Sequence, residues 1–165
     1  PILSNETWDW DEQFYNHYAR KTGWNLLPLH EGVDIVCPVG TQEIVAVHSG
    51  KIFFIGGYKI VDEEGTEGIG VFIQGDDNIL YLYFHLSSLA KQVKVGRRVK
   101  TGEVIGISGN SGFEKTDELP HLHFQMWLPR QVKDHYECEN IWEWDTHNNG
   151  FWINPEPYLK EWYKK

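Results

Sequence analysis

The sequence predicts a mainly β protein, in which antiparallel strands form a sandwich or a barrel-like sheet, with one short helix near the N-terminus. Three observations indicate this fold class. Between residues 32 and 128 the apolar residues lie in short β-branched or alternating runs, the pattern of strands. Gly-containing turns separate these runs, and most have no helical crossover between them, which favours antiparallel pairing. The 16 glycines and the 15% aromatic content are typical of a β-rich chain with many turns and a sticky surface groove.

Composition sets the size of the protein and excludes some classes of partner. The 165 residues, 41% of them hydrophobic, are enough for one domain with its own core. The 24 acidic residues outnumber the 15 basic ones, and the formal net charge of −9 argues against nucleic acids, whose binders carry basic faces. No apolar run is long enough to span a membrane, and the sequence opens on Pro1 without a signal-like segment. We therefore expect a soluble mature form or an excised domain.

The first predicted element is an amphipathic helix over residues 9–20. Trp10, Phe14 and Tyr18 recur at helical spacing, acidic residues lie early in the segment, Arg20 lies late, and Gly23 can end the helix. The predicted strands follow it in the order GVDIV (32–36), EIVAV (43–47), KIFFIGG (51–57), GIGVFIQ (68–74), NILYLYF (78–84), EVIGIS (103–108) and HLHFQMWL (121–128).

Two later segments have a different character. Residues 93–112 are two small apolar runs with a glycine turn after each, which predicts a β-meander. Residues 129–152 are interpreted as an acidic, aromatic insertion or long loop, since positions 134–147 hold five acidic residues and no Lys or Arg. Prolines after residue 153 end the strand pattern, and a last helical turn is expected from Tyr158 onward. The chain is thus predicted to be one domain over 1–165, with a helical extension over 1–28.

The two cysteines are too few for a disulfide framework. Cys37 lies in an apolar stretch and is expected to be a buried free thiol, while a single bridge to Cys138 in an oxidising compartment is the alternative.

The run HLHFQMWL carries the sharpest candidate residues. Because strand side chains alternate between faces, His121 and His123 should project side by side from one face, together with Gln125 and Trp127. The residues expected to face the core are Leu122, Phe124, Met126 and Leu128. Taken alone, the pair could equally be two exposed histidines on a solvated sheet face.

Two further motifs add possible ligands and a possible proton carrier. His30 and Asp34 in HEGVD offer the imidazole and carboxylate groups that zinc accepts, provided that Gly32 lets the segment bend. His85 follows the run NILYLYF, at the mouth of the predicted sheet, which suits proton transfer. In isolation, the first motif could be a surface coincidence and the second a hydrogen-bonded structural histidine.

The order of these motifs is more specific than any one of them. HEGVD, YFHLSSL, VKVGRRVKTGEVIGISGNSG and PHLHF resemble, in that order, the lysostaphin and LytM type of zinc endopeptidases, bacterial and phage enzymes that cut peptidoglycan. The resemblance covers residues 29–128 and resumes at INPEPYL. It implies a largely antiparallel β fold with an open substrate groove. It also implies one zinc ion bound by His30, Asp34 and His123, with His85 and His121 as the catalytic residues.

This residue set suits peptide hydrolysis. Zinc lowers the pKa of a bound water to about 7 and polarises the scissile carbonyl. A histidine with an ordinary pKa near 6.5 can accept the proton of the water and return one to the leaving amine. Whether His85 or His121 is the base is left open.

The resemblance also implies the substrate and location. We expect a zinc metalloendopeptidase that cuts a peptide cross-link or stem peptide of peptidoglycan, in the cell envelope or outside the cell, or on the virion if it is phage-encoded. It is expected to be a monomer, alone or within a larger multidomain or virion protein. Trp127, Trp142 and Trp144 are candidate substrate-binding residues, because tryptophans stack on ligands and the neighbouring acids attract a cationic amine. FEKTDELP (113–120) and YKIVDEEGTEG (58–68) depart from the family pattern where the groove walls would lie.

Two other functions compete with this one. A non-catalytic LytM-like module for binding or regulation would keep the fold and lose ligands. VKVGRRVKTGEVIG also resembles the hammerhead turns of biotinyl, lipoyl and phosphocarrier domains, which have no need of HEGVD.

Overall fold

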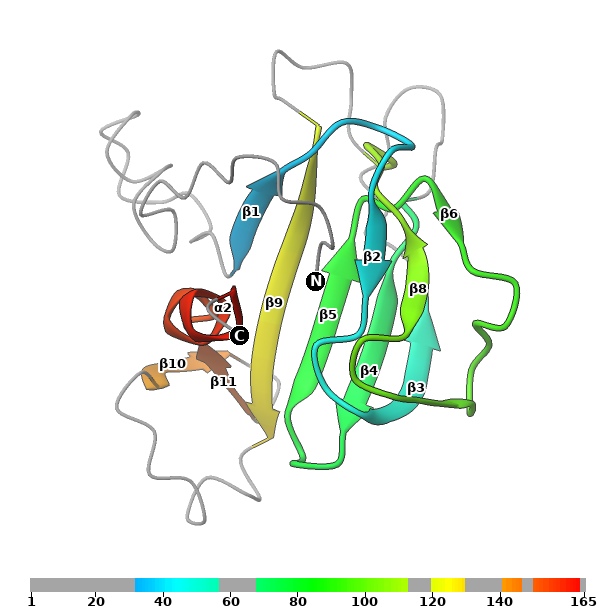
Figure 1. Ribbon diagram of the computed structural model, residues 1–165. Helices are drawn as coiled ribbons and strands as arrows, with labels where there is room; N and C mark the ends of the chain where they lie inside the picture. The colour runs from blue at the N-terminus through cyan, green and yellow to red at the C-terminus, as the bar shows by residue number, and fades with distance from the viewer. Residues whose placement is uncertain (1–31, 57–67, 113–119, 130–140, 147–149, 164–165) are drawn as a thin grey trace.

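A computed structural model describes residues 32–56, 68–112, 120–129, 141–146 and 150–163 (Figure 1). The helix predicted over 9–20 lies outside these ranges. The described strands are β1 (Val33–Val36), β2 (Glu43–Val45), β3 (Gly50–Ile55), β4 (Val71–Gly75), β5 (Leu80–Phe84), β6 (Ser88–Leu89), β7 (Arg98–Val99), β8 (Val104–Ile107), β9 (His121–Pro129), β10 (Ile141–Thr146) and β11 (Gly150–Ile153), and one helix, α2 (Glu156–Tyr163), follows them.

The larger of two sheets is organised around β9. Its strand order is β10-β11-β9-β5-β4-β3-β7, and β1 also pairs with β9. β1 pairs with residues 121–124 of β9 and β11 with residues 126–129, so these two strands share one edge of β9, while β5 takes the other edge. Every pairing in this sheet is antiparallel, which confirms the predicted mainly β, antiparallel architecture.

The smaller sheet has the order β2-β8-β6 and shares a core with the larger one. Ile44 and Ile105 of the small sheet belong to the same buried cluster as Ile52, Ile73 and Phe124 of the large sheet. The apolar residues predicted to alternate along the strands lie in this shared core, between the two sheets. Burial of the inner faces of both sheets is the main favourable term in folding.

The β-meander predicted over 93–112 is wrong. β7 pairs with β3 in the large sheet, whereas β8 pairs with β2 and β6 in the small one. A tight turn, closed by the hydrogen bond from the Glu103 N–H to the Lys100 carbonyl at 3.0 Å, carries the chain from one sheet to the other. Val99 and Ile105 both enter the shared core from opposite sides of this turn, so core burial outweighs local hairpin pairing.

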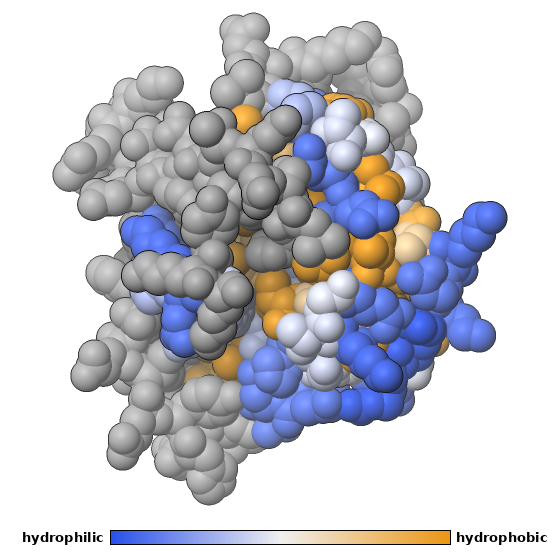
Figure 2. All heavy atoms as spheres, in the orientation of Figure 1, coloured by the Kyte–Doolittle hydropathy of each residue, from blue (hydrophilic) through white to orange (hydrophobic). Residues whose placement is uncertain are grey.

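The surface and the C-terminal region complete the described part of the molecule. The segment around β7, between β6 and β8, carries exposed Lys91, Lys94 and Lys100. Figure 2 shows hydrophilic residues at the right and lower right, where Figure 1 draws this segment. The region expected to be an insertion contains β10 and β11, and the expected last helical turn is the eight-residue α2. Cys37 is a buried free thiol, as predicted. No helix in the described ranges has the length and apolar character of a membrane span.

Candidate active site

The two histidines of β9 lie on the predicted face but are buried. His121 is 5% exposed and His123 9% exposed, and neither lies on a solvated sheet face. The alternate residues Leu122 and Phe124 are also buried, in the hydrophobic core. Buried imidazoles are stable only with polar partners, so their neighbours determine what the pair can do.

The first neighbour is Asp34, which the pairing of β1 with β9 places directly opposite His123. His123 Nδ1 donates to Asp34 Oδ1 at 2.6 Å, and His121 Nε2 lies 3.6 Å from the same oxygen. Gly32 permits this contact by close approach: a Cβ there would lie 2.6 Å from the Phe124 carbonyl oxygen and 2.9 Å from His123 Cε1. The bend predicted between His30 and Asp34 includes residues outside the described ranges, and the close approach at Gly32 is a second reason for glycine at this position.

The second neighbour is His85, which follows β5 directly. Its ring lies 5.1 Å from the ring of His121 and 6.1 Å from that of His123. Its backbone has a left-handed φ of 64°, uncommon for a non-glycine residue and a frequent mark of functional sites. His85 Nδ1 donates to the carbonyl of Ser111 at 2.9 Å. Burial lowers the pKa of His85 to about 4, against the opposing effect of this hydrogen bond.

Asp34 and His123 offer two donor atoms of the kinds that zinc accepts. Nitrogen and carboxylate oxygen ligands at 2.0–2.2 Å from a tetrahedral zinc lie about 3.3 Å from each other. The Nδ1 of His123 and Oδ1 of Asp34, 2.6 Å apart, would need to separate by about 0.7 Å. Within the described ranges no group of three or more His, Cys, Asp or Glu side chains forms a metal site. The predicted third ligand, His30, lies outside the described residues.

Gln125 is an unusual neighbour of the cluster. It is 3% exposed and lies two residues after His123 on β9, and its Oε1 is buried with no hydrogen-bond partner among the residues that the structure describes. A buried unpaired amide oxygen costs about 1–3 kcal/mol. The sequence placed Gln125 on this face without assigning it a role, because neither its burial nor its missing partner is visible in a strand pattern.

The predicted substrate-binding tryptophans fall near the far end of β9. Trp127 is half-buried and lies opposite Trp152 of β11, which in turn lies opposite Trp142 of β10. These three residues thus form one row across the strands. The sequence had not singled out Trp152, since its alignment with Trp127 depends on the β9–β11 register. The register between β10 and β11 is irregular between Trp142 and Thr146, so it aligns Trp144 with no residue of β11.

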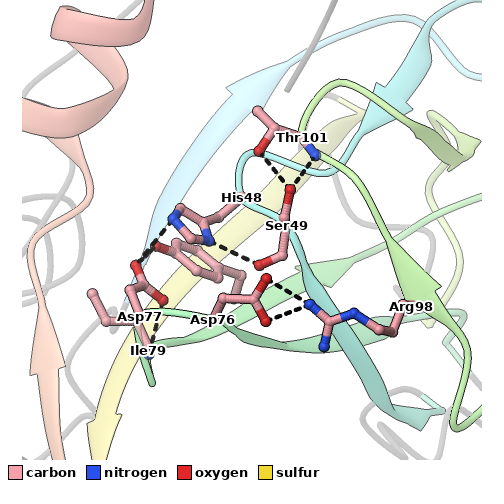
Figure 3. A network of polar contacts seen from close by, with 8 residues as sticks. His48, Ser49, Asp76, Asp77, Ile79, Arg98 and Thr101 are labelled. Atoms are coloured by element: carbon pink, nitrogen blue, oxygen red, sulfur yellow. Dashed lines mark hydrogen bonds and ion pairs between the residues drawn. The ribbon is translucent and has the colours of Figure 1, made fainter.

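A different histidine network lies at the opposite end of β5 (Figure 3). His48 Nδ1 donates to the Ser49 carbonyl at 2.9 Å, its Nε2 lies 3.7 Å from Asp77 Oδ2, and its ring stacks on Tyr81. Tyr81 donates to the same carboxylate oxygen at 2.6 Å. These contacts tie the β4–β5 turn to the segment before β3. His48 is therefore a structural histidine, distinct from the cluster on β9.

Comparison with known proteins adds independent findings. The profile of Peptidase family M23 matches residues 28–135. Lysostaphin from Staphylococcus simulans is 37% identical over 132 residues, covering 76% of this chain and 25% of lysostaphin. An L-Ala–D-Glu endopeptidase from Bacillus subtilis is 30% identical over 159 residues, 92% of this chain and 41% of that protein. The solved catalytic domain of S. simulans lysostaphin aligns with a TM-score of 0.55 at 30% identity, covering 80% of each chain. The chain spans about a quarter of the length of lysostaphin.

Proposed function

The chain belongs to peptidase family M23, and from this premise we propose that it is a zinc-dependent endopeptidase that hydrolyses peptide bonds in bacterial peptidoglycan. The observation that carries the proposal is the pairing of Asp34 with His123 beside two further buried histidines, His85 and His121. Of the similar proteins named above, only the L-Ala–D-Glu endopeptidase has a peptide bond in its name, so the proposed substrate is a cross-link or a stem peptide without a choice between them.

The proposed zinc ligands are His30, Asp34 and His123. When bound, zinc supplies a water with a pKa near 7 and polarises the scissile carbonyl. Two neutral imidazoles and one carboxylate leave a net positive charge on a divalent ion, which favours this chemistry. Asp34 and His123 are supported by their contact across β1 and β9, and His30 by its place in HEGVD.

The proposed catalytic residues are His85 and His121. A histidine accepts one proton at a time, so hydrolysis needs one imidazole to take the proton of the attacking water and a protonated group to deliver one to the leaving amine. The two rings lie 5.1 Å apart, with their planes at 73°, so both can flank one reacting group. Their burial excludes competing bulk water and strengthens each charge interaction.

The test separates metal binding from catalysis. We expect His123→Ala to lose bound zinc and activity together, because it removes a ligand. His121→Ala should retain about one equivalent of zinc and lose most activity. Zinc content is measured by elemental analysis, and activity by release of peptide fragments from purified sacculi, resolved by mass spectrometry.

His48→Ala is the matched control, since it removes a histidine outside the cluster and should keep zinc and activity. A His123→Ala protein with full zinc content and normal turnover would contradict the ligand assignment. A zinc-loaded wild-type chain that releases no fragments from any type of sacculus would contradict the endopeptidase assignment.

The substrate-binding proposal concerns Trp127, Trp142 and Trp144, to which the register adds Trp152. The supporting observation is the row of Trp127, Trp152 and Trp142 across three strands. The acidic residues around 134–147 would attract a cationic peptide amine. A Trp142→Ala, Trp144→Ala double variant, assayed at several salt concentrations, should raise KM and leave kcat nearly unchanged. An unchanged KM at every salt concentration would exclude this surface.

The remaining assignments follow from the same premise. We propose a single metallopeptidase domain over residues 1–165, acting as a monomer in the cell envelope or outside the cell, or on a virion if it is phage-encoded.

A further inference from the structure

We propose that the turn over residues 108–112 holds His85 in a single ring tautomer and backbone conformation, with Ser111 as the positioning residue. The inference rests on the proposed catalytic role of His85. It adds a residue that neither the motif pattern nor the family comparison assigns.

His85 needs such support because its backbone is strained. A non-glycine residue in the left-handed region costs about 1–3 kcal/mol and persists only where the surroundings impose it. No strand pairing does so, since β5 ends at Phe84. The constraint must therefore come from the segments packed against residues 85–87.

Ser111 provides this constraint with both its hydroxyl and its carbonyl. Its Oγ accepts from the Ile69 N–H at 2.8 Å and donates to the Leu86 carbonyl at 2.6 Å, joining the segment before β4 to the one after β5. The Leu86 N–H donates in turn to the Ile69 carbonyl at 3.0 Å. The residue that follows His85 is thus bound through both of its backbone groups.

Close packing of the same turn reinforces these bonds. A Cβ on Gly109 would lie 2.2 Å from the Ser87 nitrogen and 2.5 Å from the His85 carbonyl oxygen. The backbone of the turn therefore lies directly against the backbone of residues 85–87. The Ser87 N–H also donates to the Ile107 carbonyl at 2.9 Å, just before the turn begins.

The carbonyl of Ser111 then selects the tautomer. A carbonyl oxygen only accepts, so the Nδ1 of His85, 2.9 Å away, must carry the proton. In the neutral ring the lone pair is left on Nε2, which makes His85 a proton acceptor at that nitrogen. If the hydroxyl of Ser111 is lost, the turn loses its tether and the carbonyl can leave Nδ1, so the other tautomer becomes accessible.

The experiment compares Ser111→Ala with Ser108→Ala in the as-purified full chain. Ser108 is a matched control in the same turn: its Oγ donates to the Pro38 carbonyl at 2.6 Å and accepts from the Gln42 N–H at 3.1 Å. Each variant therefore loses two hydrogen bonds from one hydroxyl to backbone groups, but of the two serines only Ser111 contacts His85. The tautomer is read from the ¹⁵N shifts of the His85 ring, which need no catalytic activity.

We expect Ser111→Ala to show a mixture of His85 tautomers and a kcat about 10- to 100-fold lower, the usual loss for a group that orients a functional side chain. KM and zinc content should stay within about twofold of the wild type, a much smaller change than the expected loss of kcat. Ser108→Ala should keep the single tautomer and its kcat, and Ser111→Thr, which retains the hydroxyl, should restore both. If the alanine variant does not fold, Ser111→Cys, with its weakly donating thiol, should give an intermediate mixture.

A single unchanged tautomer in Ser111→Ala would overturn the proposal, as would an equal loss of kcat in Ser108→Ala. If the tautomer changes as expected but the wild type shows no peptidase activity, the positioning role stands and the proposed function fails.

Discussion

Substituting Gly32 by alanine would test how β1 is held against the histidine cluster. The added Cβ would lie 2.6 Å from the Phe124 carbonyl oxygen, 2.8 Å from Gln125 Cγ and 2.9 Å from His123 Cε1. The first of these atoms belongs to the backbone of β9, which is paired on both edges and cannot move alone. β1 must therefore shift away from β9, carrying Asp34 with it.

The expected cost follows from this overlap. Overpacking a close contact costs about 1–3 kcal/mol, while replacing glycine restricts the unfolded chain and returns about 0.4–1 kcal/mol. The net loss is about 1–2 kcal/mol, which for a chain of this length lowers Tm by about 2–8 °C. Because the methyl group touches the His123 ring and displaces Asp34, zinc affinity should fall by about tenfold.

The assay combines thermal unfolding with a zinc titration against a chromophoric chelator. Gly40→Ala is the control: its Cβ meets nothing within 4 Å, but its φ of 73° makes alanine strained by about 1–2 kcal/mol. This control should lose stability and keep its zinc affinity. The reasoning is refuted if Gly32→Ala matches the wild type in both Tm and zinc affinity, or if Gly40→Ala weakens zinc binding equally.

Two further predictions concern stability alone. Tyr83→Phe should lower the free energy of unfolding by about 1–3 kcal/mol, because the Val47 N–H, 2.9 Å from the Tyr83 hydroxyl, loses its acceptor. Chemical denaturation measures this change, and an unchanged denaturation midpoint would contradict the prediction. Glu103→Gln should be less stable than the wild type at neutral pH, since a hydrogen bond from the Lys100 N–H, with the nearby Arg97, lowers the pKa of Glu103. A depressed pKa stabilises the fold fully at pH values above the unfolded-state pKa of about 4.3. The difference in stability between the variant and the wild type should therefore vanish as pH falls through the folded-state pKa. A difference that persists in acid would contradict this cause.

The strands around the site could be predicted from the sequence, because burial of one face makes apolar residues recur at every second position. HLHFQMWL predicted that His121 and His123 share a face, and in the structure both rings lie beside the same oxygen of Asp34. The same pattern could not tell a solvated face from a buried one, because periodicity records only that alternate residues differ. Their burial depends on segments that are distant in the sequence.

The pairing of strands with one another was harder to predict from the sequence than the alternation along a single strand. The two apolar runs at 93–112 resemble a hairpin locally, yet β7 and β8 belong to different sheets because both bury residues in the shared core. β10 and Trp152 were likewise missed, since the acidic residues of this segment disfavour a strand and its pairing with β11 is not visible in the sequence.

By itself, the sequence determined the β fold class, the buried Cys37 and the set of candidate histidines and acids, because these depend on residue type and local spacing. Only the tertiary structure decided that Asp34 lies opposite His123, that Gly32 acts by close approach, and that Ser111 holds His85. The hydrogen bonds among these contacts join residues 26 and 89 positions apart. Register and packing, which follow from burying the whole core at once, bring them together.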